Sequence, residues 1–214
     1  MVHSKIVVPQ EQHEAIKDYF TQEVTQDNEQ GFNMKLKPVG VLSIPSINLE
    51  LIIYNNASED AITHGAGLIQ GSGNLHHEHD NSILTAHNGD PLNDLFINVP
   101  KLKVGDKFYI KQKDGTIDSY SIIDTQTVDP TDELTHYKKP EGDASYVTLR
   151  TCVPIGINSQ RFLATGEYQG EVENIEENPQ FTFSLVDSIL IVVILVDTGL
   201  LIRSFILDKK VSKS

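Results

Sequence analysis

The residue of this chain whose chemistry is easiest to recognise is its single cysteine, Cys152. A lone thiol forms no internal disulfide, so Cys152 is either a small buried hydrophobic residue or a reactive group. A reactive thiol needs a base to accept its proton and a cation to stabilise the anion that develops after attack. His87 and Arg161, the latter nine residues after Cys152, are the candidates for these two roles.

The place of Arg161 follows from the strands expected around it. Residues 145–152 and 161–168 are predicted to form two strands, joined by a loop that contains proline, glycine and asparagine. In an antiparallel pair joined in this way, Cys152 and Arg161 lie at the same end of adjacent strands. A guanidinium there would favour the thiolate and stabilise an oxyanion. The alternative interpretation of Arg161 is an ordinary solvated strand residue.

His87 follows the apolar run Ser82–Ala86 and precedes Asn88 and Gly89. This order places the imidazole at a predicted junction of strand and loop, where functional groups are often presented. A histidine base is the usual companion of a cysteine nucleophile. A structural histidine is the alternative, because spacing alone does not bring residue 87 next to residue 152.

The elements that would position these residues are mainly strands. Residues 40–54 are rich in β-branched side chains, and residues 107–113 and 119–128 flank the turn Asp114-Gly115, which is a hairpin signal. Helical signals between them are few and brief. We therefore predict a domain over residues 37–170 with an all-β fold, either a barrel or a sandwich.

Two terminal segments flank this domain. Residues 1–36 carry apolar side chains at helical spacing and are predicted to form an N-terminal helical segment. Residues 171–182 are an acidic linker, and residues 183–207 are a predicted transmembrane anchor, because an apolar stretch close to the ~20 residues that cross a bilayer is followed by basic residues. Asp187 and Asp197 count against a membrane span, so a buried or amphipathic helix is the alternative.

Composition narrows the range of partners. The net charge of −13 argues against nucleic acid, whose phosphates would repel the chain. The segment His76–Asp80 offers imidazole and carboxylate groups, which zinc and copper accept as ligands, but consecutive residues in a loop rarely converge on one ion. We therefore predict no metal and no other cofactor.

Three separated motifs resemble those of the sortases, the cysteine transpeptidases of Gram-positive cell surfaces. Thr148-Leu149-Arg150-Thr151-Cys152, followed by Arg161, looks like the TLxTC…R signature of that family. Residues 85–110, TAHNGDPLNDLFINVPKLKVGDKFYI, are similar to its histidine segment. Residues 152–161, CVPIGINSQR, resemble the class C, pilin-polymerising branch most closely. The similarity covers residues 38–168, with the motifs in the order that the family has.

The resemblance implies a sortase-like closed β-barrel with short helices. It implies that Cys152 is the nucleophile, His87 the general acid/base and Arg161 the cation that stabilises the oxyanion or orients the substrate. Thr151 and Thr85 are expected to bind substrate. The reaction would cleave LPxTG-like sorting signals of surface proteins or pilins between Thr and Gly. The acyl group would pass to an amine, either a pilin lysine or a lipid-linked cell-wall precursor.

The same resemblance implies a single-pass protein of the cell membrane, with the catalytic domain outside and the C-terminus in the cytoplasm. The chain departs from class C at Ala86 and Asn88, where members often have Gly and Arg, and it has no Asp-Pro-aromatic lid triplet before residue 37. Two other functions stay compatible with the sequence. One is a cysteine protease or hydrolase that uses water as acceptor, and the other is a catalytically inactive anchored surface protein.

Overall fold

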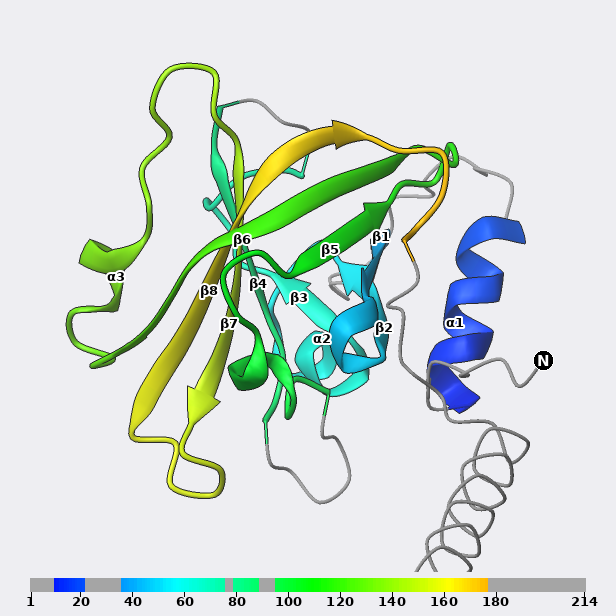
Figure 1. Cartoon of the computed structure of the whole chain (residues 1–214). Helices are drawn as coiled ribbons and strands as arrows, with labels where there is room; N and C mark the ends of the chain where they lie inside the picture. Colours follow the sequence, from blue (N-terminus) through cyan, green and yellow to red (C-terminus); the bar gives the residue numbers. More distant parts are fainter. Residues whose placement is uncertain (1–9, 22–35, 76–78, 89–94, 177–214) are drawn as a thin grey trace, which may run out of the picture. The chain divides into compact units, whose positions relative to one another are not determined.

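The computed structural model of the chain describes residues 10–21, 36–75, 79–88 and 95–176. Within these residues, strands close into one barrel in the order β1-β2-β3-β4-β7-β8-β6-β5 (Figure 1). The strands are β1 (Pro38–Ile44), β2 (Leu49–Tyr54), β3 (Ala66–Leu68), β4 (Asn81–Thr85), β5 (Lys107–Lys111), β6 (Ile117–Val128), β7 (Tyr146–Val153) and β8 (Gln160–Glu171). The prediction of an all-β fold is confirmed, and the fold is a closed barrel rather than a sandwich.

The helices of the described residues are short. They are α1 (Gln10–Thr21), α2 (Glu59–His64) and α3 (Glu133–His136), with 3-10 turns at Pro45–Ile47 and Val99–Lys101. None of the helices in this part of the chain is both long enough and apolar enough to cross a membrane. The predicted anchor at residues 183–207 lies outside the described residues, as does part of the predicted linker at residues 171–182.

The strand pairs expected from local sequence signals form. β1 and β2 pair antiparallel across the turn at Pro45–Ile47, and β5 and β6 pair antiparallel with Lys111 opposite Ile117. β7 and β8 pair antiparallel, as predicted, with Val153 opposite Gln160. β4 joins the barrel through long-range pairing, antiparallel to β3 and parallel to β7. This parallel pairing could not be read from local signals, because it joins segments about sixty residues apart.

Large apolar side chains fill the barrel interior. The rings of Phe108 on β5 and Tyr120 on β6 stack with their centroids 5.0 Å apart, and both side chains are almost fully buried. β8 accommodates them at Gly166, where an added Cβ would lie 2.2 Å from Cε1 of Phe108. Gly166 is therefore required by close packing rather than by backbone conformation.

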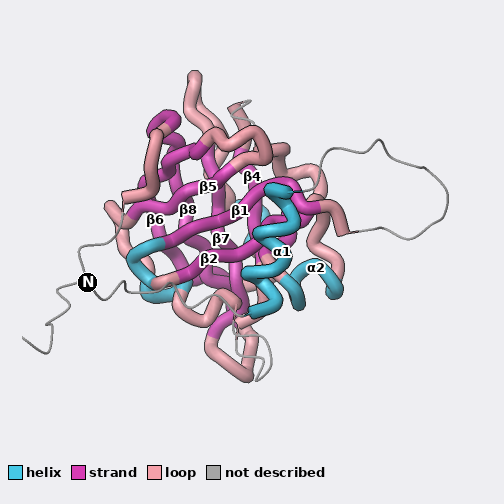
Figure 2. Tube along the Cα trace, turned by 90° about the vertical axis from the view of Figure 1, so that its right-hand side faces the viewer, coloured by secondary structure: helices cyan, strands magenta, loops and turns pink. Residues whose placement is uncertain are grey.

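A second apolar cluster lies on the outer side of β1 and β2. Val41 and Ile52 face one another across the two strands and pack with Tyr19 of α1. Figure 2 shows α1 against this side of the barrel. Because both faces of β1 and β2 are buried, their sequence is a nearly continuous apolar run rather than the alternation typical of a half-exposed strand.

We expect Gly166→Ala to lower the free energy of unfolding by about 1–3 kcal/mol, because its methyl group must displace the ring of Phe108 in a packed core. Urea unfolding measures the loss. Gly40→Ala is the matched control, since a Cβ there would be no closer than 3.3 Å to Cγ2 of Ile110, and its loss should be below about 1 kcal/mol. Equal stability of the Gly166 variant and the wild type would show that the ring moves without cost.

Candidate active site

The register of three adjacent strands sets the geometry of the site. β7 lies between β4 and β8, with Thr85 of β4 opposite Arg150 and with Arg161 of β8 opposite Cys152. His87 follows Thr85 by two residues, just past the end of β4, and Cys152 follows Arg150 by two residues in β7. Because β4 and β7 are parallel, His87 and Cys152 lie at the same level. The structure thus brings the three predicted site residues to the same end of the barrel.

Two hydrogen bonds tie the segment after β4 to the end of β7. The hydroxyl of Thr151 donates to the carbonyl oxygen of Ala86 at 3.1 Å, and Nδ2 of Asn88 donates to the carbonyl oxygen of Cys152 at 2.9 Å. The side chains of Thr151 and Asn88 are buried. These bonds flank His87 on both sides, so they fix the backbone that carries the imidazole relative to the backbone that carries the thiol.

Cys152 is half-buried and has no disulfide partner. Side chains alternate along a strand, so Cys152 shares a face of β7 with Arg150, whereas Thr151 lies on the other face and is fully buried. The hydroxyl of Thr85, the second residue predicted to bind substrate, accepts a hydrogen bond from Nη1 of Arg150 at 3.2 Å. Both threonine hydroxyls therefore already have partners within the protein.

His87 is held by a carboxylate that the sequence did not single out. Nε2 of His87 lies 2.9 Å from Oε1 of Glu59, the first residue of α2. The hydroxyl of Ser58 caps this helix by accepting from the N–H of Ala61. The pair lies near the surface, with 29% of the His87 side chain and 81% of the Glu59 side chain exposed. Contact of Nε2 with Glu59 leaves Nδ1 as the ring nitrogen available for other partners.

Arg161 is fixed at one edge of its guanidinium. Nη1 donates to the carbonyl oxygens of Asn158 and Gln160, each at 2.9 Å. Nε is buried and makes no hydrogen bond, and it lies 3.8 Å from Oε2 of Glu133 on α3. The remaining donor group, Nη2, is the one that can be offered to a bound molecule.

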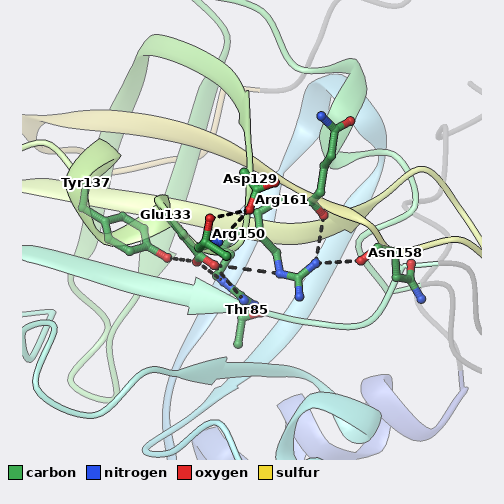
Figure 3. Close-up of polar contacts among 9 residues, drawn as sticks. Thr85, Asp129, Glu133, Tyr137, Arg150, Asn158 and Arg161 are labelled. Atoms are coloured by element: carbon green, nitrogen blue, oxygen red, sulfur yellow. Dashed lines mark hydrogen bonds and ion pairs between the residues drawn. The ribbon is translucent and has the colours of Figure 1, made fainter.

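Glu133 is the centre of a buried polar cluster that connects α3 to β7 (Figure 3). Arg150 binds its carboxylate in a bidentate manner, through Nε to Oε1 and through Nη2 to Oε2 at 3.1 Å, and the hydroxyl of Tyr137 donates to Oε1. Burial alone would raise the pKa of Glu133, but the hydrogen bonds from Arg150 and Tyr137 and the charges of Arg150 and Arg161 outweigh it and lower the pKa. Glu133 is therefore an ionised, nearly buried carboxylate next to two guanidinium groups.

The partners respond in the opposite direction. Burial raises the pKa of Tyr137, and the hydrogen bond to Glu133 raises it further. Burial would lower the pKa of Arg150, but its hydrogen bond and ion pair with Glu133 raise it, with a contribution from nearby Cys152. All three groups thus keep the protonation states that hold the cluster together at neutral pH.

Sequence reasoning missed Glu59, Glu133 and Tyr137, which lie in segments that match no motif. A signal for the cluster was nevertheless present at Arg150, a charged residue within an otherwise apolar and hydroxyl-bearing strand. A buried charge in such a strand needs a counter-charge nearby. The sequence shows that need without showing which carboxylate meets it.

The segment His76–Asp80 is described only at His79 and Asp80. The N–H of His79 donates to the hydroxyl of Ser145 at 3.3 Å. In the part of the chain that the structure describes, no three His, Cys, Asp or Glu side chains are grouped closely enough to hold a metal ion.

Comparison with known proteins gives one consistent family. The family model of the sortase domain matches residues 42–169. Sortase A of Bacillus anthracis is 29% identical over 143 residues, which are 64% of this chain and 62% of that protein. Sortase A of Listeria monocytogenes is 26% identical over 140 residues, or 61% of this chain and 56% of that protein. The match thus spans less than two thirds of the length of these curated relatives.

Similar solved structures include sortases C of streptococci. Sortase C of Streptococcus pneumoniae superimposes with a TM-score of 0.59 at 29% identity, over 77% of this chain and 89% of that one. A pilus-related sortase C of group B Streptococcus has a TM-score of 0.58 at 30% identity, over 69% and 77% of the two chains.

The Glu133 cluster predicts how stability depends on pH. A carboxyl group whose pKa is lowered on folding stabilises the folded state above its unfolded pKa of about 4.3, and this contribution is lost as pH falls through the folded value. Wild type should therefore lose more unfolding free energy between pH 7 and pH 3 than Glu133→Gln, which has no such group to titrate. At pH 7 the variant should be less stable by about 1–3 kcal/mol, because Arg150 loses its charged partner.

Urea unfolding at a series of pH values makes this measurement. Asp132→Asn is the matched control, because Asp132 is an exposed neighbour and its removal causes the same change in net charge. Parallel pH profiles for wild type and Glu133→Gln would contradict the prediction.

Proposed function

This chain belongs to the sortase family of cysteine transpeptidases, and on that premise we propose that it cleaves an LPxTG-like sorting signal between Thr and Gly and transfers the acyl group to an amine. The observation that carries the proposal is the common level of Cys152, His87 and Arg161 at one end of three adjacent strands. A thiol, an imidazole and a guanidinium can serve as the nucleophile, the general acid/base and the oxyanion-stabilising cation of covalent acyl transfer.

In the first half of the proposed reaction, His87 accepts the thiol proton of Cys152, and Sγ attacks the carbonyl carbon of Thr in the sorting signal and forms a C–S bond. The carbonyl oxygen becomes an oxyanion, which Arg161 stabilises through the edge of its guanidinium that the loop carbonyls leave open. Collapse of this intermediate breaks the C–N bond. His87 gives its proton to the departing amine of Gly, and a thioester remains on Cys152.

In the second half, an incoming amine gives a proton to His87 and attacks the thioester. The new amide bond forms as the C–S bond breaks, and the sulfur of Cys152 is regenerated. Glu59 supports both halves by holding Nε2 of His87 and so fixing the orientation of the ring. Thr85 and Thr151 remain predicted substrate-binding residues. In this proposal their hydroxyl groups also join the C-terminal end of β4 and the residue Ala86 to β7.

The proposed acceptor is a pilin lysine or the amino group of a lipid-linked cell-wall precursor. The pilus-related name of one similar structure supports the lysine, and the sortase A names of the curated relatives support the wall precursor. Sortases are proteins of the cell envelope, and we propose that the predicted segment 183–207 anchors this chain in the cell membrane with the barrel outside.

We expect Cys152→Ala to abolish turnover of an LPxTG peptide and the thioester adduct seen by mass spectrometry. His87→Ala and Arg161→Ala should each lower the rate of acylation by about 10²-fold or more, because each removes a group that acts only in the transition state. His64→Ala, an exposed histidine at the other end of α2, is the control and should retain the wild-type rate.

An added lysine peptide or a wall-precursor mimic then identifies the acceptor from the mass of the product. Release of the free acid regardless of added amine would show that water is the acceptor and that the chain is a hydrolase rather than a transpeptidase. Turnover that persists in Cys152→Ala would contradict the proposed function, because the proposed reaction proceeds through a thioester on Cys152.

A further inference from the structure

One buried carboxylate serves two guanidinium groups in this site. Arg150 takes both oxygens of Glu133 in a bidentate ion pair, and Nε of Arg161 lies against the same carboxylate, 3.8 Å from Oε2. The side chain of Glu133 is 11% exposed, and the side chains of Arg150 and Arg161 are 20% and 19% exposed. Charges this far from water interact more strongly than surface pairs do, and a change in one is felt by the others.

Arg161 meets this carboxylate on the side away from the loop. The carbonyl oxygens of Asn158 and Gln160 hold Nη1, and Glu133 lies beside Nε (Figure 3). A planar guanidinium held at Nη1 and attracted at Nε has its rotation fixed, with Nη2 as the group left to meet a ligand. Since Nε makes no hydrogen bond, the attraction of Glu133 is the interaction that compensates for its burial.

Glu133 is itself held in place from three directions. The hydroxyl of Tyr137 and two nitrogens of Arg150 donate to its oxygens, and the hydroxyl of Thr85 accepts from the third nitrogen of Arg150. The carboxylate beside Arg161 is thus connected to α3, to β7 and to β4, the strand that precedes His87. Such a hydrogen-bonded network around Glu133 is rigid and can hold a cation in one orientation.

We propose that Glu133 is a positioning residue for Arg161: it sets the orientation in which the guanidinium faces the acyl carbonyl on Cys152. The inference rests on the proposed function, because it assigns Arg161 its role there. Glu133 does not touch the reacting atoms and takes no proton in the reaction. Its effect on the reaction passes through Arg161, which separates it from a residue that merely stabilises α3.

The first test needs no substrate. The chain has three arginines, Arg150, Arg161 and Arg203, so its arginine Nε–H groups give three NMR cross-peaks that Arg150→Lys and Arg161→Lys can assign. Glu133→Gln should move the Arg161 cross-peak because the charge beside Nε is gone. Glu133→Asp should move it as well, because the charge stays but is withdrawn by one methylene, and this variant decides the matter if Glu133→Gln fails to fold. Asp132→Asn should leave the cross-peak in place.

The second test is a double-mutant cycle on the rate at which Cys152 is acylated by an LPxTG peptide. Glu133→Gln should lower kcat by about 10-fold with KM changed less than about 2-fold, since the carboxylate acts on a group used in the transition state. In an Arg161→Ala background the same substitution should lower the rate by less than about 2-fold, because the group through which it acts is absent.

The outcomes are distinct. An Arg161 cross-peak that stays at its wild-type position in both Glu133 variants overturns the inference, whatever the enzyme does. An equal loss of rate with and without Arg161 also overturns it and leaves Glu133 a structural residue. If the cross-peak moves but wild type acylates no sorting peptide, the positioning of Arg161 is supported and it is the proposed function that fails.

Discussion

The backbone ladders on both sides of β7 are the constraint on which the site depends. β7 is hydrogen-bonded to β4 in a parallel register and to β8 in an antiparallel register. The parallel partner brings a segment from earlier in the chain that ends at the same edge as β7, and the antiparallel partner begins there. One strand end thus collects a thiol, an imidazole and a guanidinium from three segments. Because the barrel is closed, none of these strands is free to slip by a residue without disturbing its neighbours.

Electrostatics adds a second requirement. A site that stabilises an oxyanion needs a cation, and a cation partly withdrawn from water needs compensation. Here a single carboxylate from the segment between β6 and β7 lies beside both guanidinium groups, and its ionised form is favoured by them. Full neutralisation of Arg161 would weaken its pull on a bound oxygen. The stronger bidentate pairing of Glu133 with Arg150 leaves Arg161 only partly neutralised, which suits a cation that must still attract a substrate.

The parts of the fold that could be predicted are those encoded locally. The β5–β6 hairpin and the β7–β8 pair follow from turn residues between β-branched runs. The sequence therefore predicted that Cys152 and Arg161 lie at the same end of adjacent strands. The approach of His87 to Cys152 was accessible only through family resemblance, because it depends on a parallel pairing between distant segments. Glu133 and Glu59 could not be predicted, because the sequence does not distinguish a solvated acidic residue from one that pairs with an arginine or a histidine of another segment. Their roles arise from polar contacts between segments that are separated in the sequence.

The outer cluster of β1 and β2 limits how the chain can be divided. Sequence patterns place the start of the catalytic domain at residue 37, yet Val41 and Ile52 on the outer wall are shielded by Tyr19, which comes well before that point. A shortened chain beginning at Pro38 would keep every strand and every residue of the site but would expose the apolar outer surface of β1 and β2 to water. Such an exposed apolar surface favours association with a second copy of the chain. The smallest unit that conceals its own apolar surface therefore includes α1, and the helix is a piece of the barrel in physical terms although it contributes no strand.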